Sequence, residues 1–412
     1  MLIAKIRRRI SVAIGFSVVS ALLLPVPQSM AQSMSGMHMQ PRKAAQPCKS
    51  SQPLGCADRA SGAFSPDGTL LLAWTQDKKV YFARSKDKGQ SWTLPLMIGD
   101  AREGFDGGGD ARPQLAANAK GSVLIAYDTF KDQNWNAEIW LASSVDGGTH
   151  FDTPRVFEPE SVSQRLPVLS MTPAGRILML WQDKRLSGPQ KRPGASLAYA
   201  WSMDGGRTFS PSAIAAEVSC ECCRIGVTNS SSGEPVAAFR TIFPEQVRDH
   251  ALLQFSPSGS PRAPLRVATD NWKTNACPHH GPSVSVSNDG TTHMVWYTQG
   301  QARQGLFYAR LGHGEQAFSE PQRLGGVDDA SSHPYVLVQG QQVWRVWKAF
   351  DGQASHVMLQ QSGNDGRDWS APKVISSSTG GSDHPLLLGY QDHAYLSWLS
   401  SQHGYQLIDL KE

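Results

Sequence analysis

Leu70-Leu-Leu-Ala-Trp74 is a short apolar run that ends in an aromatic residue, and variants of it recur along the chain. The further copies are Val123-Leu-Ile-Ala-Tyr127, Ile177-Leu-Met-Leu-Trp181, Pro235-Val-Ala-Ala-Phe239, Thr292-His-Met-Val-Trp296, Val343-Trp-Arg-Val-Trp347 and Ala394-Tyr-Leu-Ser-Trp398. The closing aromatic residues lie 51 to 58 residues apart, which indicates one supersecondary unit used seven times. Each unit has room for four short strands and shows no amphipathic helix. The sequence therefore predicts an all-β chain.

A second motif falls in the hairpin that follows several of these runs. Its copies are Ser85-Lys-Asp87-Lys-Gly89-Gln-Ser-Trp92, Ser144-Val-Asp146-Gly-Gly148-Thr-His-Phe151, Ser202-Met-Asp204-Gly-Gly206-Arg-Thr-Phe209 and a looser Ser362-Gly-Asn-Asp365-Gly366-Arg-Asp-Trp369. Asp or Asn with Gly favours a tight turn. These residues resemble the Asp-box of sialidase-type (BNR) repeats, over residues 57–412. The resemblance implies a β-propeller of four-stranded antiparallel blades, and the Asp-box itself carries no catalytic information.

The number of blades follows from the number of repeats. Seven aromatic runs predict seven blades, whereas enzymes of the sialidase family have six, which is the alternative. The last repeat, Asp383 to Leu410, has room for three strands only. We therefore expect part of residues 41–56 to supply its outer strand and to close the ring.

The N-terminal 31 residues are typical of a secretory signal peptide. A basic start is followed by an apolar run and by Ser29-Met30-Ala31, a small-x-small cleavage site. The segment holds four of the 39 basic residues and none of the 35 acidic ones, so the mature chain is balanced in charge. Nucleic acid is therefore not an expected partner. No later apolar run has the length of a membrane span, and we expect a bacterial periplasmic location.

Residues 32–56 are expected to form an N-terminal arm that precedes the propeller repeats. The arm contains a cluster of soft ligands, namely Met34, Met37, His38 and Met39. Cys48 and Cys56 close it, and a local disulfide between them is expected in an oxidising compartment. The methionine cluster resembles methionine-rich copper-handling segments of periplasmic proteins.

In a propeller the innermost strands all run the same way along the axis, so the residues just before them meet at one mouth of the channel. The predicted mouth residues that carry thiols or imidazoles are Cys220, Cys222, Cys223, Cys277, His279, His280, His333 and His384. Arg112, Arg165 and Arg224 occupy corresponding positions and are candidates for lining the mouth and binding an anion. Each residue alone has an ordinary structural explanation. Together they predict a site.

Soft and borderline ligands of this kind suit Cu(I) or Zn(II) and bind Ca(II) or Mg(II) poorly. We predict a metal site formed by Cys222, Cys223, Cys277 and either His279 or His280, with Cys220 beside them. The thioethers of the arm favour Cu(I), with zinc as the alternative. The predicted function is copper acquisition, buffering or delivery to a periplasmic or outer-membrane metal-transport partner. Disulfides such as Cys220–Cys223 or Cys222–Cys277 are the structural alternative.

The resemblance to sialidases implies an enzymatic alternative. That family clamps a substrate carboxylate with three arginines and uses a tyrosine nucleophile. Gln164-Arg165-Leu166-Pro167 is similar to the family's Arg-Ile-Pro motif, and Arg112 and Arg224 complete a possible cluster. No tyrosine–glutamate pair is evident, and the family's acid/base aspartate has no secure match. A third hypothesis, a carbohydrate-binding or protein-binding module, requires only the mouth loops and exposed aromatic residues such as Trp135 and Trp272.

Overall fold

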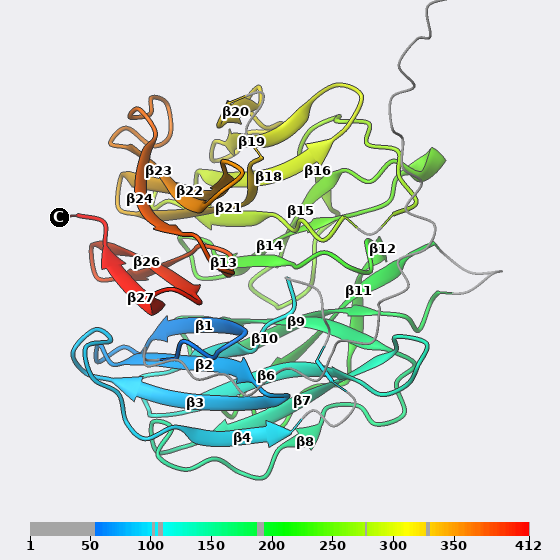
Figure 1. Cartoon of the computed structure of the whole chain (residues 1–412). Helices are drawn as coiled ribbons and strands as arrows, with labels where there is room; N and C mark the ends of the chain where they lie inside the picture. The colour runs from blue at the N-terminus through cyan, green and yellow to red at the C-terminus, as the bar shows by residue number, and fades with distance from the viewer. Residues whose placement is uncertain are drawn as a thin grey trace, which may run out of the picture. The chain divides into compact units, whose positions relative to one another are not determined.

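The computed structural model describes residues 54–100, 104–105, 110–187, 193–276, 278–326 and 330–411. These ranges contain 27 strands and a single 3₁₀ turn, η1 (Pro244–Gln246). Figure 1 shows the strands grouped in small sheets that follow one another along the chain. In the part of the chain that the structure describes, no helix is long and apolar enough to span a membrane.

Six sheets have four strands and the last has three, and neighbouring strands are antiparallel in sequence order. The first blade contains β1 (Arg59–Phe64), β2 (Leu70–Gln76), β3 (Lys79–Ser85) and β4 (Leu96–Asp100). The second contains β5 (Gln114–Ala117), β6 (Val123–Phe130), β7 (Ala137–Ser144) and β8 (Arg155–Val156). The third contains β9 (Gln164–Met171), β10 (Ile177–Asp183), β11 (Ala195–Ser202) and β12 (Ala213–Ser219).

The remaining blades repeat this pattern. The fourth contains β13 (Gly226–Asn229), β14 (Pro235–Arg240), β15 (His250–Gln254) and β16 (Leu265–Arg266). The fifth contains β17 (Ser283–Val286), β18 (Thr292–Gln299), β19 (Gln304–Leu311) and β20 (Gln322–Leu324). The sixth contains β21 (Ser332–Gln339), β22 (Gln342–Phe350), β23 (Ser355–Ser362) and β24 (Lys373–Ser378). The seventh contains β25 (Leu386–Tyr390), β26 (His393–Ser400) and β27 (Gly404–Asp409).

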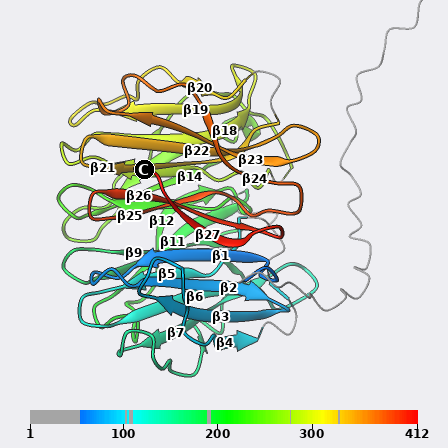
Figure 2. The ribbon, with the colours of Figure 1, turned by 60° about the vertical axis from the view of Figure 1, so that its left-hand side comes forward.

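The first strand of every blade lies on the propeller axis. Neighbours around the axis contact one another in the order β1, β5, β9, β13, β17, β21 and β25, and β25 contacts β1 again. The last blade therefore lies beside the first, as Figures 1 and 2 both show. The prediction of a seven-bladed, all-β propeller is confirmed. The predicted fourth strand of the last blade falls mostly outside the described residues, and Leu54 to Cys56 form a turn.

The apolar cores lie between adjacent blades. One cluster joins β6 and β7 of the second blade to β10 of the third through residues such as Leu124, Ile139 and Trp181. The recurring aromatic residue lies on the second strand of each blade, and each is at most 2 % exposed. Neighbouring blades cover both faces of each blade. These strands therefore consist of consecutive apolar residues and do not alternate between apolar and polar residues.

The Asp-box turns connect the third and fourth strands at the opposite end of the blades from the strand starts of the axis. In the copy at Ser144, the Gly148 N–H donates to Ser144 Oγ at 3.0 Å, and this hydroxyl donates to Asp146 at 2.8 Å. Gly148 has φ +78° and packs against Phe82 of the first blade, where a Cβ would lie 2.6 Å from the ring. The glycine thus fixes both the turn and the contact between blades.

Cys56 takes part in a disulfide. Its predicted partner Cys48 lies outside the described residues. The predicted signal peptide at residues 1–31 and the predicted ligands Met34, Met37, His38 and Met39 also lie outside the described residues, so they stay predictions.

Candidate functional site

Asp110 organises the mouth at which the axial strands begin. Its Oδ2 accepts hydrogen bonds from the main-chain N–H groups of Arg224 at 3.1 Å and Gly281 at 3.0 Å. Its Oδ1 lies 3.3 Å from the Arg224 guanidinium, which also donates to the Pro334 carbonyl at 2.9 Å. A single buried ion pair therefore connects the strand starts of the second, fourth, fifth and sixth blades.

The other predicted arginines also lie at the mouth. Arg112 pairs with Asp383 at 2.8 Å, with both side chains 5 % exposed, and donates to the Ala60 carbonyl at 3.1 Å. Arg165 places its guanidinium over the ring of Phe130, 5.7 Å from the centroid. Arg112 and Arg224 thus form ion pairs with carboxylates of the protein itself. In a site that clamps a substrate carboxylate, the arginines would instead be available to the substrate.

The axis beneath this mouth holds a cavity of about 130 Å³, whose lining includes Asp110, Arg112, Gln114, Arg224 and Tyr335. Pockets for small-molecule ligands usually measure about 300–1,000 Å³. Burial raises the pKa of Tyr335 above its usual value, which keeps the phenol protonated. The cavity therefore suits a few water molecules better than a sugar residue, and a glycan would have to bind at the rim of the mouth.

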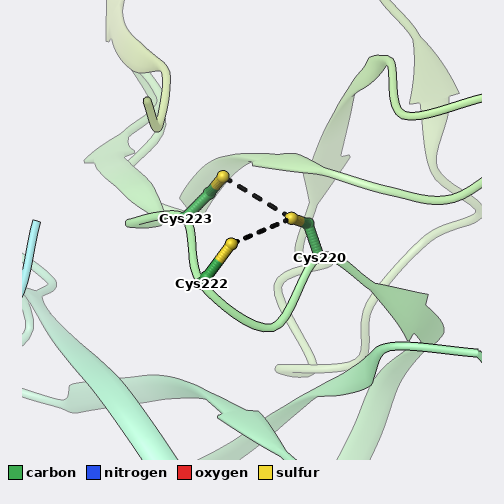
Figure 3. Close-up of side chains that lie close together, drawn as sticks. All are labelled: Cys220, Cys222 and Cys223. Atoms are coloured by element: carbon green, nitrogen blue, oxygen red, sulfur yellow. Dashed lines mark hydrogen bonds between the residues drawn. The ribbon is translucent and has the colours of Figure 1, made fainter. Parts of the chain in front are cut away.

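Cys220, Cys222 and Cys223 form a thiol cluster directly after β12 (Figure 3). The Sγ of Cys220 lies 3.6 Å from that of Cys222 and 3.5 Å from that of Cys223, and all three residues are at most 1 % exposed. The structure holds them as thiols and not as disulfides. The main-chain N–H of Cys220 donates to the Arg240 carbonyl at 2.8 Å, which anchors the loop to β14.

Two buried arginines give the thiol cluster a positive surrounding. Arg248 donates to the Sγ of Cys220 at 3.4 Å. The pKa of Cys220 lies well below its usual value because Cys222 and Cys223 donate S–H bonds to it and because Arg240 and Arg248 are near. Burial raises the pKa of Cys223. The arrangement favours ionisation of Cys220 over Cys223 within a preformed set of three soft ligands.

Arg240 is 1 % exposed and donates to three main-chain carbonyls, those of Arg248, His280 and Tyr297, at 2.9–3.0 Å. Its guanidinium also stacks on the Trp272 ring, 4.4 Å from the centroid. These neighbours orient the cation without neutralising it. A buried charge needs an opposite charge nearby. Cys220, whose pKa is lowered by Arg240 among other groups, can supply that charge when it ionises.

Three imidazoles stand in a column across the fifth, sixth and seventh blades. The rings of His333 and His384 are stacked with centroids 3.4 Å apart, and the ring of His280 lies 4.5 Å from that of His333. Burial lowers the pKa of all three, to about 4 for His280, to about 2 for His333 and well below the usual value for His384. The column is therefore neutral at neutral pH.

The sequence analysis placed most of these residues at one mouth of the propeller but did not identify every residue that contacts them. Cys277 lies outside the described residues, and His279 is half-buried with φ +50° at the start of the fifth blade. Arg240, Arg248 and His250 were not predicted, since they lie at strand ends behind the mouth. A charged residue that closes an apolar run, as Arg240 closes Pro235 to Phe239, is the signal that could have found the first of them.

The sequence matches no protein-family model and no curated protein sequence. Solved structures share its fold. A polysaccharide lyase of family PL25, an ulvan lyase, has a TM-score of 0.59 at 12 % identity, with 84 % of this chain and 91 % of that chain covered. The same lyase bound to -[GlcA(1-4)Rha3S]- has a TM-score of 0.58 at 12 % identity, over 84 % of this chain and 91 % of that one.

A leech intramolecular trans-sialidase has a TM-score of 0.50 at 11 % identity, with 83 % of this chain and 82 % of that chain covered. At such low identity the likeness concerns architecture and not chemistry. The chain therefore has a sialidase-like β-propeller fold, of the kind also found in polysaccharide lyases.

Proposed function

We propose that this protein binds a soft metal ion, Cu(I), through the thiolates of Cys220, Cys222 and Cys223 at the propeller mouth. The observation that carries the proposal is the convergence of three buried sulfur atoms beside two buried guanidiniums. Guanidiniums beside a cluster of thiols favour the thiolate form, which is the form in which cysteine binds a metal ion.

The sulfur positions fit a shared ion. Metal–thiolate bonds of about 2.3 Å separate two sulfur ligands by about 3.8 Å at a tetrahedral ion and by about 4.0 Å at a trigonal one. The distances from Cys220 Sγ to the other two sulfurs, 3.6 and 3.5 Å, are within about 0.5 Å of both values, and all three sulfurs lie within 4.8 Å of one another. A small rotation of each side chain would accommodate the ion.

Charge balance favours a monovalent ion. Three thiolates and one Cu(I) carry a net charge of −2, which Arg240 and Arg248 would offset in full. A divalent ion would leave one positive charge in excess in a buried site. Thiolates are also the ligands that Cu(I) prefers. Zn(II) is the alternative ion, with Cys277, His279 or His280 as candidates for a fourth ligand.

The test is anaerobic titration with Cu(I) in competition with a Cu(I)-specific chelator. We expect one equivalent per chain and the release of about two protons, because Cys222 and Cys223 must ionise when the metal binds. Cys220→Ser/Cys223→Ser should lose stoichiometric binding. Ser219→Ala is the matched control, since it lies beside the cluster, is buried and leaves all three thiols in place.

If the double variant does not fold, the wild-type protein provides the answer through its thermal unfolding. An ion that binds the native state alone raises the midpoint, and a hundredfold excess over the dissociation constant adds about 2.7 kcal/mol. A protein that keeps its unfolding midpoint with Cu(I), and that takes up none in the titration, would refute the proposal.

The biological setting remains part of the proposal. A signal peptide and a methionine-histidine arm would place the protein in the periplasm and give the ion an exposed first binding point. The propeller site would then store the ion or pass it to a metal-transport partner. Shortening the chain to begin at residue 41 should slow Cu(I) uptake while leaving the stoichiometry unchanged.

A second candidate function is the binding of an acidic glycan at the rim of the mouth. Trp135 is 51 % exposed, and its ring stands edge-on to Phe130 at 5.1 Å, while Arg165 covers the same phenylalanine at 5.7 Å. An aromatic face beside a guanidinium is suited to a uronate-containing sugar chain. The fold of the similar polysaccharide lyases is compatible with this function but does not assign it.

Trp135→Ala is expected to weaken binding of a soluble uronate-containing polysaccharide about tenfold, equivalent to about 1.4 kcal/mol, in calorimetry or affinity electrophoresis. Phe350→Ala is the control, because this aromatic residue is also exposed, by 47 %, but belongs to the sixth blade. Absence of any binding by the wild-type protein, or equal effects of the two substitutions, would exclude this candidate.

A further inference from the structure

We propose a second metal site at the mouth, formed by Asp110, His333 and His384, which takes a borderline divalent ion such as Zn(II) or Cu(II). The site uses no thiol and does not depend on the Cu(I) proposal. It accounts for the imidazole column, which the thiol site leaves without a role.

The ligand atoms are close enough to share one ion. One ligand atom of each residue lies within 4.8 Å of the other two. His384 Nδ1 is 3.7 Å from Asp110 Oδ1, which is too long for a hydrogen bond. Bonds of about 2.0–2.1 Å place two ligands of a common ion between about 3.3 Å apart, for a tetrahedral angle, and about 4.2 Å apart, for a linear one. The observed distance falls inside this interval.

The ring nitrogens that would bind the ion lack other partners. The Nδ1 atoms of His280, His333 and His384 are buried and have no hydrogen-bond partner in the described part of the chain. His384 is 8 % exposed. Buried polar atoms of this kind normally form a hydrogen bond. Leaving such an atom without a hydrogen-bond partner costs about 1–3 kcal/mol. Two of these three atoms, those of His333 and His384, belong to the proposed site and are available to bind an ion.

Hydrogen bonding also sets the tautomer of His333. The main-chain carbonyl of His279 favours a proton on the ring, and because Nδ1 has no partner among the described residues, that proton is assigned to Nε2. The other nitrogen, Nδ1, then carries a lone pair. A carbonyl that orients a metal-binding histidine through its second nitrogen is a recurrent arrangement in metal sites.

Stacking and charge set the limits of the site. The rings of His333 and His384 are parallel within 18°. One ring must therefore rotate about its Cβ–Cγ bond before both Nδ1 lone pairs can point at one ion. This torsion has a broad allowed range in histidine. Arg112, Arg224 and Lys348 act electrostatically on His384, and Asp110 and Asp383 offset two of these cations. One positive charge is left over before the metal binds, so a divalent ion would bring the site to an excess of three, which an anionic fourth ligand such as hydroxide or chloride would lower by one.

The experiment uses Co(II) and Zn(II) with the Cys220→Ser/Cys222→Ser/Cys223→Ser chain, in which the thiol cluster cannot bind either ion. We expect one equivalent of Zn(II) by calorimetry and a Co(II) complex with visible d–d bands but no thiolate charge-transfer band. Adding His384→Asn should weaken binding by about a hundredfold or more, since loss of a metal ligand costs more than loss of its hydrogen-bond partner. His313→Asn, an exposed histidine at the other end of the blades, is the control.

If the serine variant does not fold, the wild-type chain loaded with one equivalent of Cu(I) is titrated with Zn(II) instead. Retained uptake of one Zn(II), lost in His384→Asn, supports the proposal. It is overturned if no Zn(II) binds or if His384→Asn binds Zn(II) as tightly as the control. The Cu(I) titration stands separately, so failure of either site is distinguishable from failure of the other.

Discussion

Asp110→Ala is expected to lower the free energy of unfolding by about 3–5 kcal/mol, the usual cost of removing one partner of a buried ion pair. Asp110 is 4 % exposed and accepts from the N–H groups of Arg224 and Gly281 as well as from the Arg224 guanidinium. The substitution leaves Arg224 buried without its counter-charge and two main-chain donors without an acceptor. Because these groups belong to different blades, the loss should act on the whole propeller.

Denaturant unfolding followed by tryptophan fluorescence measures this effect. Asp110→Asn separates the two contributions, since an amide can still accept a main-chain hydrogen bond but carries no charge, and it should cost less than alanine. Glu160→Ala is the control, an exposed acidic residue expected to change stability by less than about 0.5 kcal/mol. A loss below about 1 kcal/mol for Asp110→Ala would mean that Asp110 does not hold the mouth together.

The stability of the protein is expected to fall steeply as the pH drops below about 6.5. His250 is 1 % exposed, and its ring lies beside the main-chain carbonyl of His280, which also accepts a hydrogen bond from Arg240. Burial, with the nearby Arg240, holds its pKa well below the usual value. The unfolded chain therefore binds a proton at this residue near pH 6.5, whereas the folded chain does not. Below that pH, His250 alone lowers the free energy of unfolding by about 1.4 kcal/mol for each pH unit.

The sign of this dependence is fixed by the direction of the shift. Since the folded-state pKa is the lower one, the loss begins at the unfolded pKa and continues as the pH falls towards the folded one. His280, with a pKa of about 4, adds a similar contribution between pH 6.5 and 4. Unfolding midpoints measured from pH 7.5 to 4.5 should show the slope.

His250→Leu should flatten that slope by about one proton while leaving the stability at pH 7.5 within about 2 kcal/mol, because an apolar side chain of similar size replaces a buried imidazole that is neutral at that pH. His313→Leu, which replaces an exposed histidine, should leave the slope unchanged. If the two variants have the same pH dependence, then His250 titrates in the folded state and its burial does not exclude the proton.

Much of the site could be foreseen because a propeller converts position in a repeat into position in space. Residues before each axial strand meet at one mouth, so Cys222, Arg224, His333 and His384 could be assigned to a common region from spacing alone. Spacing says nothing about which side chains then touch. Cys220 proved to be the centre of the thiol cluster, and His280 packs on Tyr297 and His333.

The amino-acid sequence by itself determined the seven-fold repeat, the Asp-box turns and the order of the blades, because these depend on local periodicity and turn chemistry. Only the tertiary structure decided how charges are paired at the mouth. Asp110 and Arg224 are 114 residues apart in the chain, and Arg112 and Asp383 are 271 apart. Such pairs form when closure of the ring brings distant strand starts together and burial excludes the water that would otherwise solvate them. No local pattern encodes that event.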